Sequence, residues 1–165
     1  MDVLQAVKSK HAVRQFSDQP VSDDIIRQIL DAGRRSQSSK NTQPWAFICI
    51  RDRERLIALS KTGTYAGHLA GAAFAVVLVG MEHSDWNSFD LGQASSYLQL
   101  AAWGLGVGSC IATLHDEAAA REVLGLPAET GLFLALSFGY PAADWTPNKG
   151  GRRPLDELVR WETWQ

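Results

Sequence analysis

The spacing of hydrophobic residues along the chain alternates between the helical and the extended kind. Apolar residues three and four apart predict amphipathic helices, and short β-branched or aromatic runs predict strands. The helices expected from this pattern are 2–10, 22–33, 52–59, 90–103, 116–124 and a short C-terminal helix over 155–164. The strands expected from it are 45–50, 73–80, 107–114 and 132–138. Together these elements indicate an α+β sandwich that is mostly helix.

Two of these helices have clear sequence signals at their ends. Ser22 is a good N-cap, the two aspartates after it suit the positive end of the helix dipole, and Gly33 is the expected C-cap. The stretch His115-Asp116-Glu117 stands where the helix over 116–124 begins, which indicates capping rather than metal binding.

The helix over 90–103 and the C-terminal tail both carry more apolar surface than a short chain readily covers. The helix has apolar residues almost all round, which suggests a partner subunit. The tail from 142 to 165 holds Trp145, Trp161 and Trp164, and the last two form one stripe with Leu158. We therefore expect the tail to dock on its own core or on that of a neighbour.

Composition and charge exclude several classes of protein. The chain has 165 residues, is 45% hydrophobic and carries a formal net charge of -2, so we expect a single domain over 1–165 and no general affinity for nucleic acid. The longest apolar run, 72–79, is far shorter than the roughly 20 residues of a membrane span. The N-terminus lacks a signal-peptide layout, so we expect a cytoplasmic protein with no membrane partner. Cys49 and Cys110 lie in apolar stretches and are expected to be reduced core thiols.

Common catalytic motifs are missing or in the wrong context. The glycine-rich stretch over 104–109 follows a helix and leads into a strand, whereas a dinucleotide-binding loop follows a strand and opens a helix. It instead indicates a helix end with a close approach of two backbones. The four histidines are dispersed without ligand spacing, so no metal site is expected.

Three polar segments suit an anionic ligand. The first, over 8–14, has three basic side chains and a histidine; the second, over 34–44, has no large apolar side chain; the third, over 149–153, combines basic residues with two glycines. Each alone is typical of a solvated surface.

In this order, the three segments resemble the FMN-dependent nitroreductase family. The stretch KHAVRQF over 10–16 is similar to the family's R-R-S-x-R-x-F motif, and SSKNTQPW over 38–45 to its S-x-x-N-x-Q-P-W loop. The stretch RRPL over 152–155 resembles its C-terminal basic clamp, and LQLAAWGLGVGSC over 98–110 its interface helix and the following turn.

The resemblance implies a fold, an assembly and an activity. The fold would be a nitroreductase-like three-layer sandwich, with a central, mostly antiparallel sheet flanked by helices. The chain would form a homodimer with two FMN molecules at the subunit interface, and the C-terminal tail would dock on the dimer partner. Electrons would pass from NAD(P)H through FMN to a small-molecule acceptor, such as a nitroaromatic or a quinone, by a ping-pong mechanism.

The resemblance also implies which residues bind FMN, while the cofactor itself carries the chemistry. Arg14 would stabilise the negative charge of the reduced ring, Lys10, Arg152 and Lys149 would hold the phosphate, and the polar loop would fix the ring or ribityl chain. The full expected set is Lys10, His11, Arg14, Ser38, Ser39, Asn41, Gln43, Ala112, Thr113, Lys149 and Arg152. The stretch over 10–16 departs from the motif at Lys10, where the family has its first arginine, and at Ala12, where it has serine.

Two other functions remain compatible with these residues. One is a flavin-binding or structural dimer with little turnover. The other is a specialised dehydrogenase or dehalogenase of the same fold, because such activities share one cofactor frame.

Overall fold

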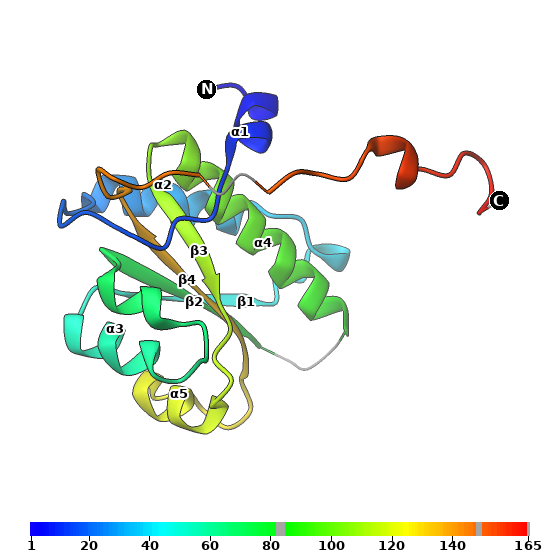
Figure 1. Ribbon diagram of the computed structural model, residues 1–165. Helices are drawn as coiled ribbons and strands as arrows, with labels where there is room; N and C mark the ends of the chain where they lie inside the picture. Colours follow the sequence, from blue (N-terminus) through cyan, green and yellow to red (C-terminus); the bar gives the residue numbers. More distant parts are fainter. Residues whose placement is uncertain (82–84, 148–149, 165) are drawn as a thin grey trace.

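A four-stranded antiparallel sheet forms the centre of the computed structural model, which describes residues 1–81, 85–147 and 150–164 (Figure 1). The strands are β1 (Trp45–Ile50), β2 (Phe74–Gly80), β3 (Gly108–Ala112) and β4 (Gly131–Gly139), in the spatial order β1-β2-β4-β3. Every residue of β2 is buried, as its unbroken apolar run predicts for a strand covered on both faces. All four predicted strands are confirmed.

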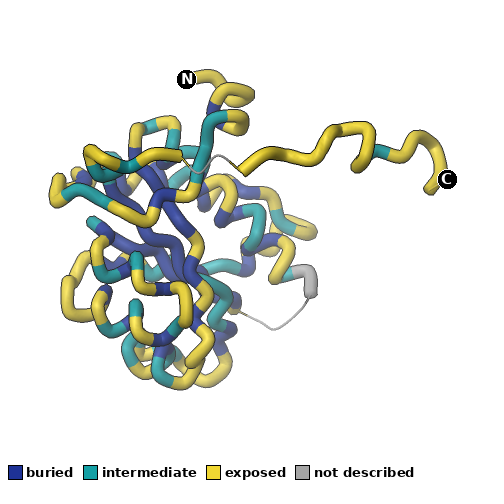
Figure 2. The backbone as a smooth tube through the Cα atoms, in the orientation of Figure 1, coloured by how far each residue is buried: buried dark blue, intermediate teal, exposed yellow. Residues whose placement is uncertain are grey.

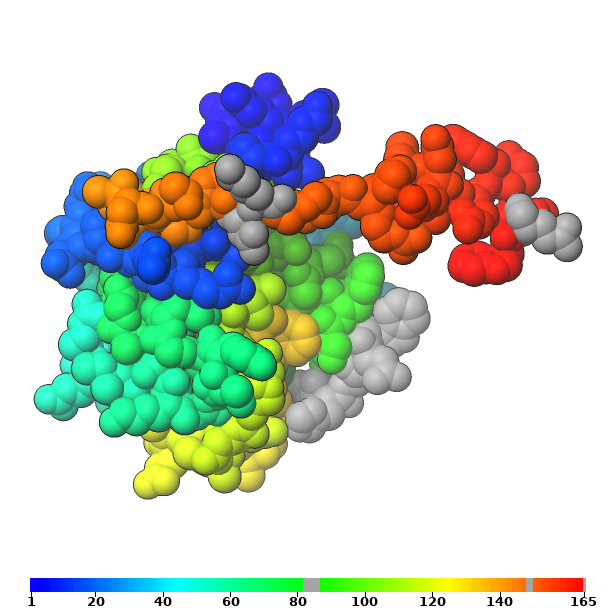
Figure 3. Space-filling model, in the orientation of Figure 1, coloured from blue at the N-terminus to red at the C-terminus, as the bar shows by residue number. Residues whose placement is uncertain are grey.

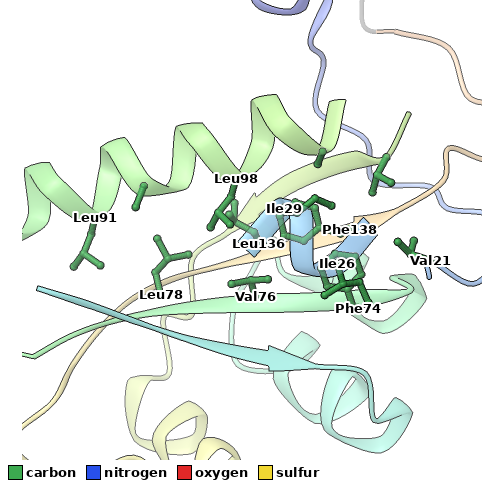
Figure 4. Close-up of a cluster of buried hydrophobic side chains, with 13 residues drawn as sticks. Val21, Ile26, Ile29, Phe74, Val76, Leu78, Leu91, Leu98, Leu136 and Phe138 are labelled. Carbon is green, nitrogen blue, oxygen red and sulfur yellow. The ribbon is translucent and has the colours of Figure 1, made fainter. Parts of the chain in front are cut away.

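Helices cover both faces of this sheet. On one face, α2 (Asp23–Arg34) and α4 (Asp85–Gly104) pack over a core that includes Leu98, Phe74 and Phe138 (Figure 4). The rings of the two phenylalanines stack with their centroids 4.8 Å apart. On the other face, α3 (Arg53–Ser60), α5 (Glu117–Leu124) and the 3-10 helix η2 (Gly67–Gly71) enclose a second apolar cluster. The predicted three-layer α+β sandwich is confirmed.

Most helix ends follow their sequence signals, with one exception. The Ser22 hydroxyl accepts from the Ile25 amide, and the Asp116 carboxylate caps α5 by accepting from the Ala119 amide at 3.1 Å. The prediction of Gly33 as a C-cap is wrong, because α2 continues to Arg34. A Cβ on Gly33 would lie 2.6 Å from a methyl group of Leu98, so this glycine allows α2 and α4 to approach closely.

Residues 10–17 have no regular secondary structure, yet two glycines fix their place at the end of the sheet. Gly108 and Gly139 are cross-strand partners on β3 and β4, and they receive the side chains of Val13 and Phe16 respectively. The Val13 amide donates to the Ser109 carbonyl at 3.0 Å. The close backbone approach predicted for the glycine-rich stretch is therefore confirmed, and it holds the basic N-terminal segment in position.

The C-terminal tail packs on the subunit at its first tryptophan and is exposed farther along the chain. The ring of Trp145 lies edge-on to Trp103 of α4, with centroids 6.3 Å apart. The segment before Trp145 runs antiparallel beside the N-terminal segment, with a bridge between Pro141 and Phe16 (Figure 3). Beyond Gly150 the chain extends away from the rest of the subunit, and Trp161 and Trp164 are 81% and 87% exposed (Figure 2). The predicted helix over 155–164 is wrong: only the 3-10 turn η3 (Leu155–Glu157) forms, because the tryptophan stripe meets no apolar surface within its own chain.

Three further differences concern local positions. Helix α4 begins at Asp85, five residues before the predicted start. The prediction began too late because three of the five residues over 85–89 are polar, so the apolar run on which it rests starts only after them. Cys110 is a buried free thiol as predicted, but the prediction of a core position is wrong for Cys49, which is exposed on the edge strand β1. In the part of the chain that the structure describes, no helix is long and apolar enough to cross a bilayer.

Candidate active site

A cavity of about 740 Å³ opens between the N-terminal segment and the start of the C-terminal tail. Its volume is in the range of cofactor and ligand pockets. Two of the three predicted anion-suited segments meet here, although more than 130 residues of sequence lie between them. The lining residues are Val7, Lys8, Lys10, His11, Ala12, Arg14, Gly150 and Arg152.

The cations of this cavity lack negative partners. Among the described residues, no carboxylate lies within ion-pair distance of Lys8, Lys10, Arg14 or Arg152. The neighbouring Arg153 differs, because its guanidinium pairs with Glu157 at 3.2 Å. Several unpaired cations around one hollow repel one another, and an anion bound between them would relieve that repulsion.

Lys10 is the most enclosed of these cations. Its Nζ donates to the Gln99 side-chain oxygen on α4 at 2.6 Å. Burial lowers the pKa of Lys10 below that of a free lysine, with a smaller opposing effect from the Cys110 thiol. An ammonium group that loses water in this way favours a bound anion that restores its charge balance.

The positive charge of Arg14 also reaches the sheet behind the cavity. Burial lowers the pKa of His68, and the Arg14 guanidinium lowers it further, against a weaker effect of the Ile111 backbone. Burial raises the pKa of the Cys110 thiol, while Arg14 and then Lys10 oppose that rise. The Nδ1 atom of His68 lies 2.8 Å from the Ser137 hydroxyl, and this contact helps to fix the orientation of the ring.

The second predicted segment, the polar loop between α2 and β1, is held in an unusual conformation. Lys40, Asn41 and Gln43 have positive φ angles of 51°, 58° and 49°. The loop contains the 3-10 turn η1 (Ser39–Asn41), and the Gln43 amide donates to the Ser38 hydroxyl at 2.9 Å. Non-glycine residues in the left-handed region carry strain and are typical of functional loops.

This loop lies beside a different side of α4 from the cavity. The Ser39 amide donates to the Asp90 carboxylate at 3.0 Å, whereas Lys10 contacts Gln99. Nine residues along a helix correspond to about 13 Å of axis and two and a half turns, so Asp90 and Gln99 face opposite directions. The structure thus brings the first and third segments together and leaves the second apart.

The remaining predicted residues are placed as follows. The Ala112 side chain is buried in the core cluster beneath α3 and α5, so only its backbone is available to a ligand, and Thr113 beside it is exposed. His11 lines the cavity and its ring lies edge-on to Trp145 at 6.5 Å. Lys149 lies outside the described residues.

The predicted set of site residues does not include Lys8 or Gln99, two polar side chains at the cavity or in contact with Lys10. Lys8 lines the cavity, and its place in the basic segment over 8–14 was the available signal. Gln99 contacts Lys10 from 89 residues away, and nothing local in the sequence marks it as part of a site.

Comparison with known proteins agrees with the motifs. The sequence profile of the nitroreductase family matches residues 7–66 and 55–140. The chain belongs to the nitroreductase family. A relative from Archaeoglobus fulgidus that carries the names NADH dehydrogenase and NAD(P)H nitroreductase is 32% identical, over 99% of both chains.

Solved structures of family members resemble the whole chain. An FMN-dependent nitroreductase from Clostridium difficile is 26% identical, with a TM-score of 0.89 over 98% of this chain and 99% of its own. A structure from Desulfovibrio desulfuricans, described as a nitroreductase in complex with FMN, is 29% identical, with a TM-score of 0.88 over 100% and 99% of the two chains. The nitroreductase fold expected from the motifs is therefore confirmed.

Proposed function

We propose that this protein is an FMN-dependent oxidoreductase that takes electrons from NAD(P)H and passes them to a small organic acceptor. The observation that carries the proposal is the cavity in which Lys8, Lys10, Arg14 and Arg152 lack acidic partners among the described residues. The phosphate of FMN carries up to two negative charges, which several converging cations can balance. Family membership and the FMN-linked relatives support the same assignment.

The residues have separate roles in this proposal. Lys10 and Arg152 bind the phosphate, and Lys8 adds positive charge at the rim. Arg14 supplies a fixed cation for negative charge on the ring, and its guanidinium has no carboxylate partner among the described residues to compete for it. Bound FMN supplies the hydride and electron chemistry, and the protein supplies binding, orientation and charge.

The second subunit of a homodimer supplies the polar loop in this proposal. Within one chain the loop and the cavity contact opposite sides of α4, and a partner related by a two-fold axis can present its loop to the cavity of the first. Exposed apolar side chains support such an interface. Val3, Leu4 and Val7 on α1 (Val3–Ser9) are 75%, 70% and 58% exposed.

An apolar groove continues this surface. It has a volume of about 480 Å³ and runs between α1 and α4, past Val3, Tyr97 and Leu100. The exposed tail of a second copy, with Trp161 and Trp164, is an apolar segment able to cover such a surface. The proposal includes this docking of the tail. It also includes a nitroaromatic or quinone acceptor, a ping-pong kinetic mechanism and a cytoplasmic location.

Two measurements test the proposal. Purified protein should carry, or take up, FMN with a visible flavin absorption band that bleaches anaerobically when NADH or NADPH is added. A protein that takes up no FMN would contradict the proposal, and a bound flavin that neither nicotinamide bleaches would favour the binding-only alternative. Initial rates with a panel of nitroaromatics and quinones should give the parallel double-reciprocal lines of a ping-pong mechanism.

A further inference from the structure

The inner partner of Lys10 is a neutral amide. The Gln99 oxygen accepts from the Lys10 ammonium at 2.6 Å, and the Gln99 amide nitrogen donates to the Ser95 hydroxyl at 3.2 Å. An ammonium group can only donate, so the oxygen of Gln99 must face Lys10 and its nitrogen must face Ser95. Gln99 and Ser95 are one turn apart on α4 and only 6% and 2% exposed, so their contact is buried, and the contact of Gln99 with Lys10 is partly buried.

This arrangement fixes the Lys10 side chain without reducing its charge. A lysine ammonium is a compact charge on a flexible stem, and it lacks the rigid fork with which arginine orients itself on a phosphate. A buried carboxylate at position 99 would hold the ammonium too, but it would cancel the charge that the ligand needs. An amide supplies the orientation alone and leaves the other two N–H groups of Lys10 for an acceptor in the cavity.

We propose that Gln99 and Ser95 are positioning residues that hold Lys10 toward the cavity with its charge undivided, so that it can bind the phosphate of FMN. The inference rests on the proposed function, because it takes the anion to be the FMN phosphate. It assigns a role to two α4 residues that do not line the cavity themselves. It also explains how the chain uses lysine where the family motif has arginine.

Three variants separate positioning from simple packing. Gln99→Glu keeps the shape and adds a negative charge, Gln99→Met removes the acceptor at similar volume, and Ser95→Ala frees the amide. Gln93→Glu is the matched control, because it adds the same charge six residues earlier on α4, about 9 Å along the axis. The unfolding midpoint of each variant is measured in parallel.

The decisive measurement compares FMN with riboflavin, which lacks only the phosphate. Each ligand is titrated into protein from which flavin has been removed. Gln99→Glu should weaken FMN binding by about tenfold or more and change riboflavin binding less than about twofold. Gln99→Met and Ser95→Ala should weaken FMN binding by a smaller factor, again without affecting riboflavin, and Gln93→Glu should leave both unchanged.

The pH dependence gives a readout that packing alone would not move. Burial lowers the pKa of Lys10, so the preference for FMN over riboflavin should decline as the pH rises and Lys10 loses its proton. A carboxylate at position 99 raises the pKa of Lys10, so any remaining preference should decline at a higher pH in Gln99→Glu. The charged and titratable groups that line the cavity beside Lys10 are Lys8, His11 and Arg14 of its own segment and Arg152 of the tail. The Cys110 thiol of β3 does not line the cavity but acts electrostatically on Lys10.

The outcomes distinguish a failure of the proposed FMN-dependent function from a failure of the positioning role alone. A native protein that binds neither flavin overturns the proposed function, and this inference with it. A native preference for FMN that Gln99→Glu retains in full overturns this inference alone. Tighter FMN binding in Gln99→Met would also overturn it, because Gln99 would then compete with the ligand for Lys10.

Discussion

Replacing Gly108 with alanine should disturb the site through the backbone, without touching any cation. A Cβ at this position would lie 2.6 Å from one methyl carbon of Val13 and 2.7 Å from its Cβ. Ordinary carbon contacts are about 3.5–4.0 Å, so Val13 and its segment must move by about 1 Å. Val13 is fully buried, and overpacking of this kind costs about 1–3 kcal/mol, offset by about 0.4–1 kcal/mol from the stiffer unfolded chain.

The expected loss in the free energy of unfolding is therefore about 1–2 kcal/mol, which corresponds to a fall in Tm of about 2–8 °C for a chain of this size. Since the same segment carries Lys10 and Arg14, FMN affinity should also fall, by about tenfold if one charged hydrogen bond is lost. Chemical denaturation and flavin titration measure the two effects.

Gly71→Ala is the matched control for this prediction. A Cβ on Gly71 meets no atom within 4 Å, so only the effect of the stiffer unfolded chain remains: stability should rise by about 0.4–1 kcal/mol and FMN affinity should not change. If Gly108→Ala matches this control in both assays, the contact between Val13 and Gly108 does not place the basic segment, and the reasoning is refuted.

Three other predictions follow from the site and the surface. Arg14→Ala should lower FMN affinity by about 10–100-fold, whereas Arg34→Ala, whose parent side chain pairs with Asp31 on the surface, should not; equal dissociation constants would falsify the role of Arg14. Sedimentation at low micromolar concentration should show a dimer, because the exposed face of α1 and the adjoining groove need a cover, and a folded 18.1 kDa species would contradict this. Cutting the chain after Leu155 keeps Arg152 but removes both exposed tryptophans, so it should weaken the dimer and FMN binding together; a truncated dimer with native FMN affinity would show that the tail does neither.

Local sequence signals were sufficient for most of the secondary structure. The strand at β2 followed from one apolar run, and the caps at Ser22 and Asp116 followed from the residue types alone. Signals that depend on a neighbour failed, since Gly33 has the residue type of a cap but its role is set by Leu98 on another helix. The tryptophan stripe of the tail has helical spacing, yet no helix forms where its own chain offers no surface.

The candidate site shows the same division. Lys10, Arg14 and Arg152 could be chosen from motifs, and the structure brings them to one cavity. Gln99 could not be chosen, because only the path of the chain through the sheet brings it to Lys10. The polar loop is separated from the cavity because Asp90 and Gln99 face opposite directions around α4. That separation could not be predicted, because the sequence does not show that Ser39 contacts Asp90 and Lys10 contacts Gln99.

Arg152 stands at the boundary between the packed subunit and the exposed tail, and this position links two binding equilibria. Its side chain lines the cavity, while the residues that follow it extend away from the subunit (Figure 1). A partner surface that immobilises the tail also restricts where Arg152 can go, which reduces the entropy that an anion must overcome to bind it. By thermodynamic reciprocity, the bound anion then raises the affinity of the partner subunit by the same factor. Cofactor affinity should accordingly depend on protein concentration, and subunit exchange should slow when the cavity is filled.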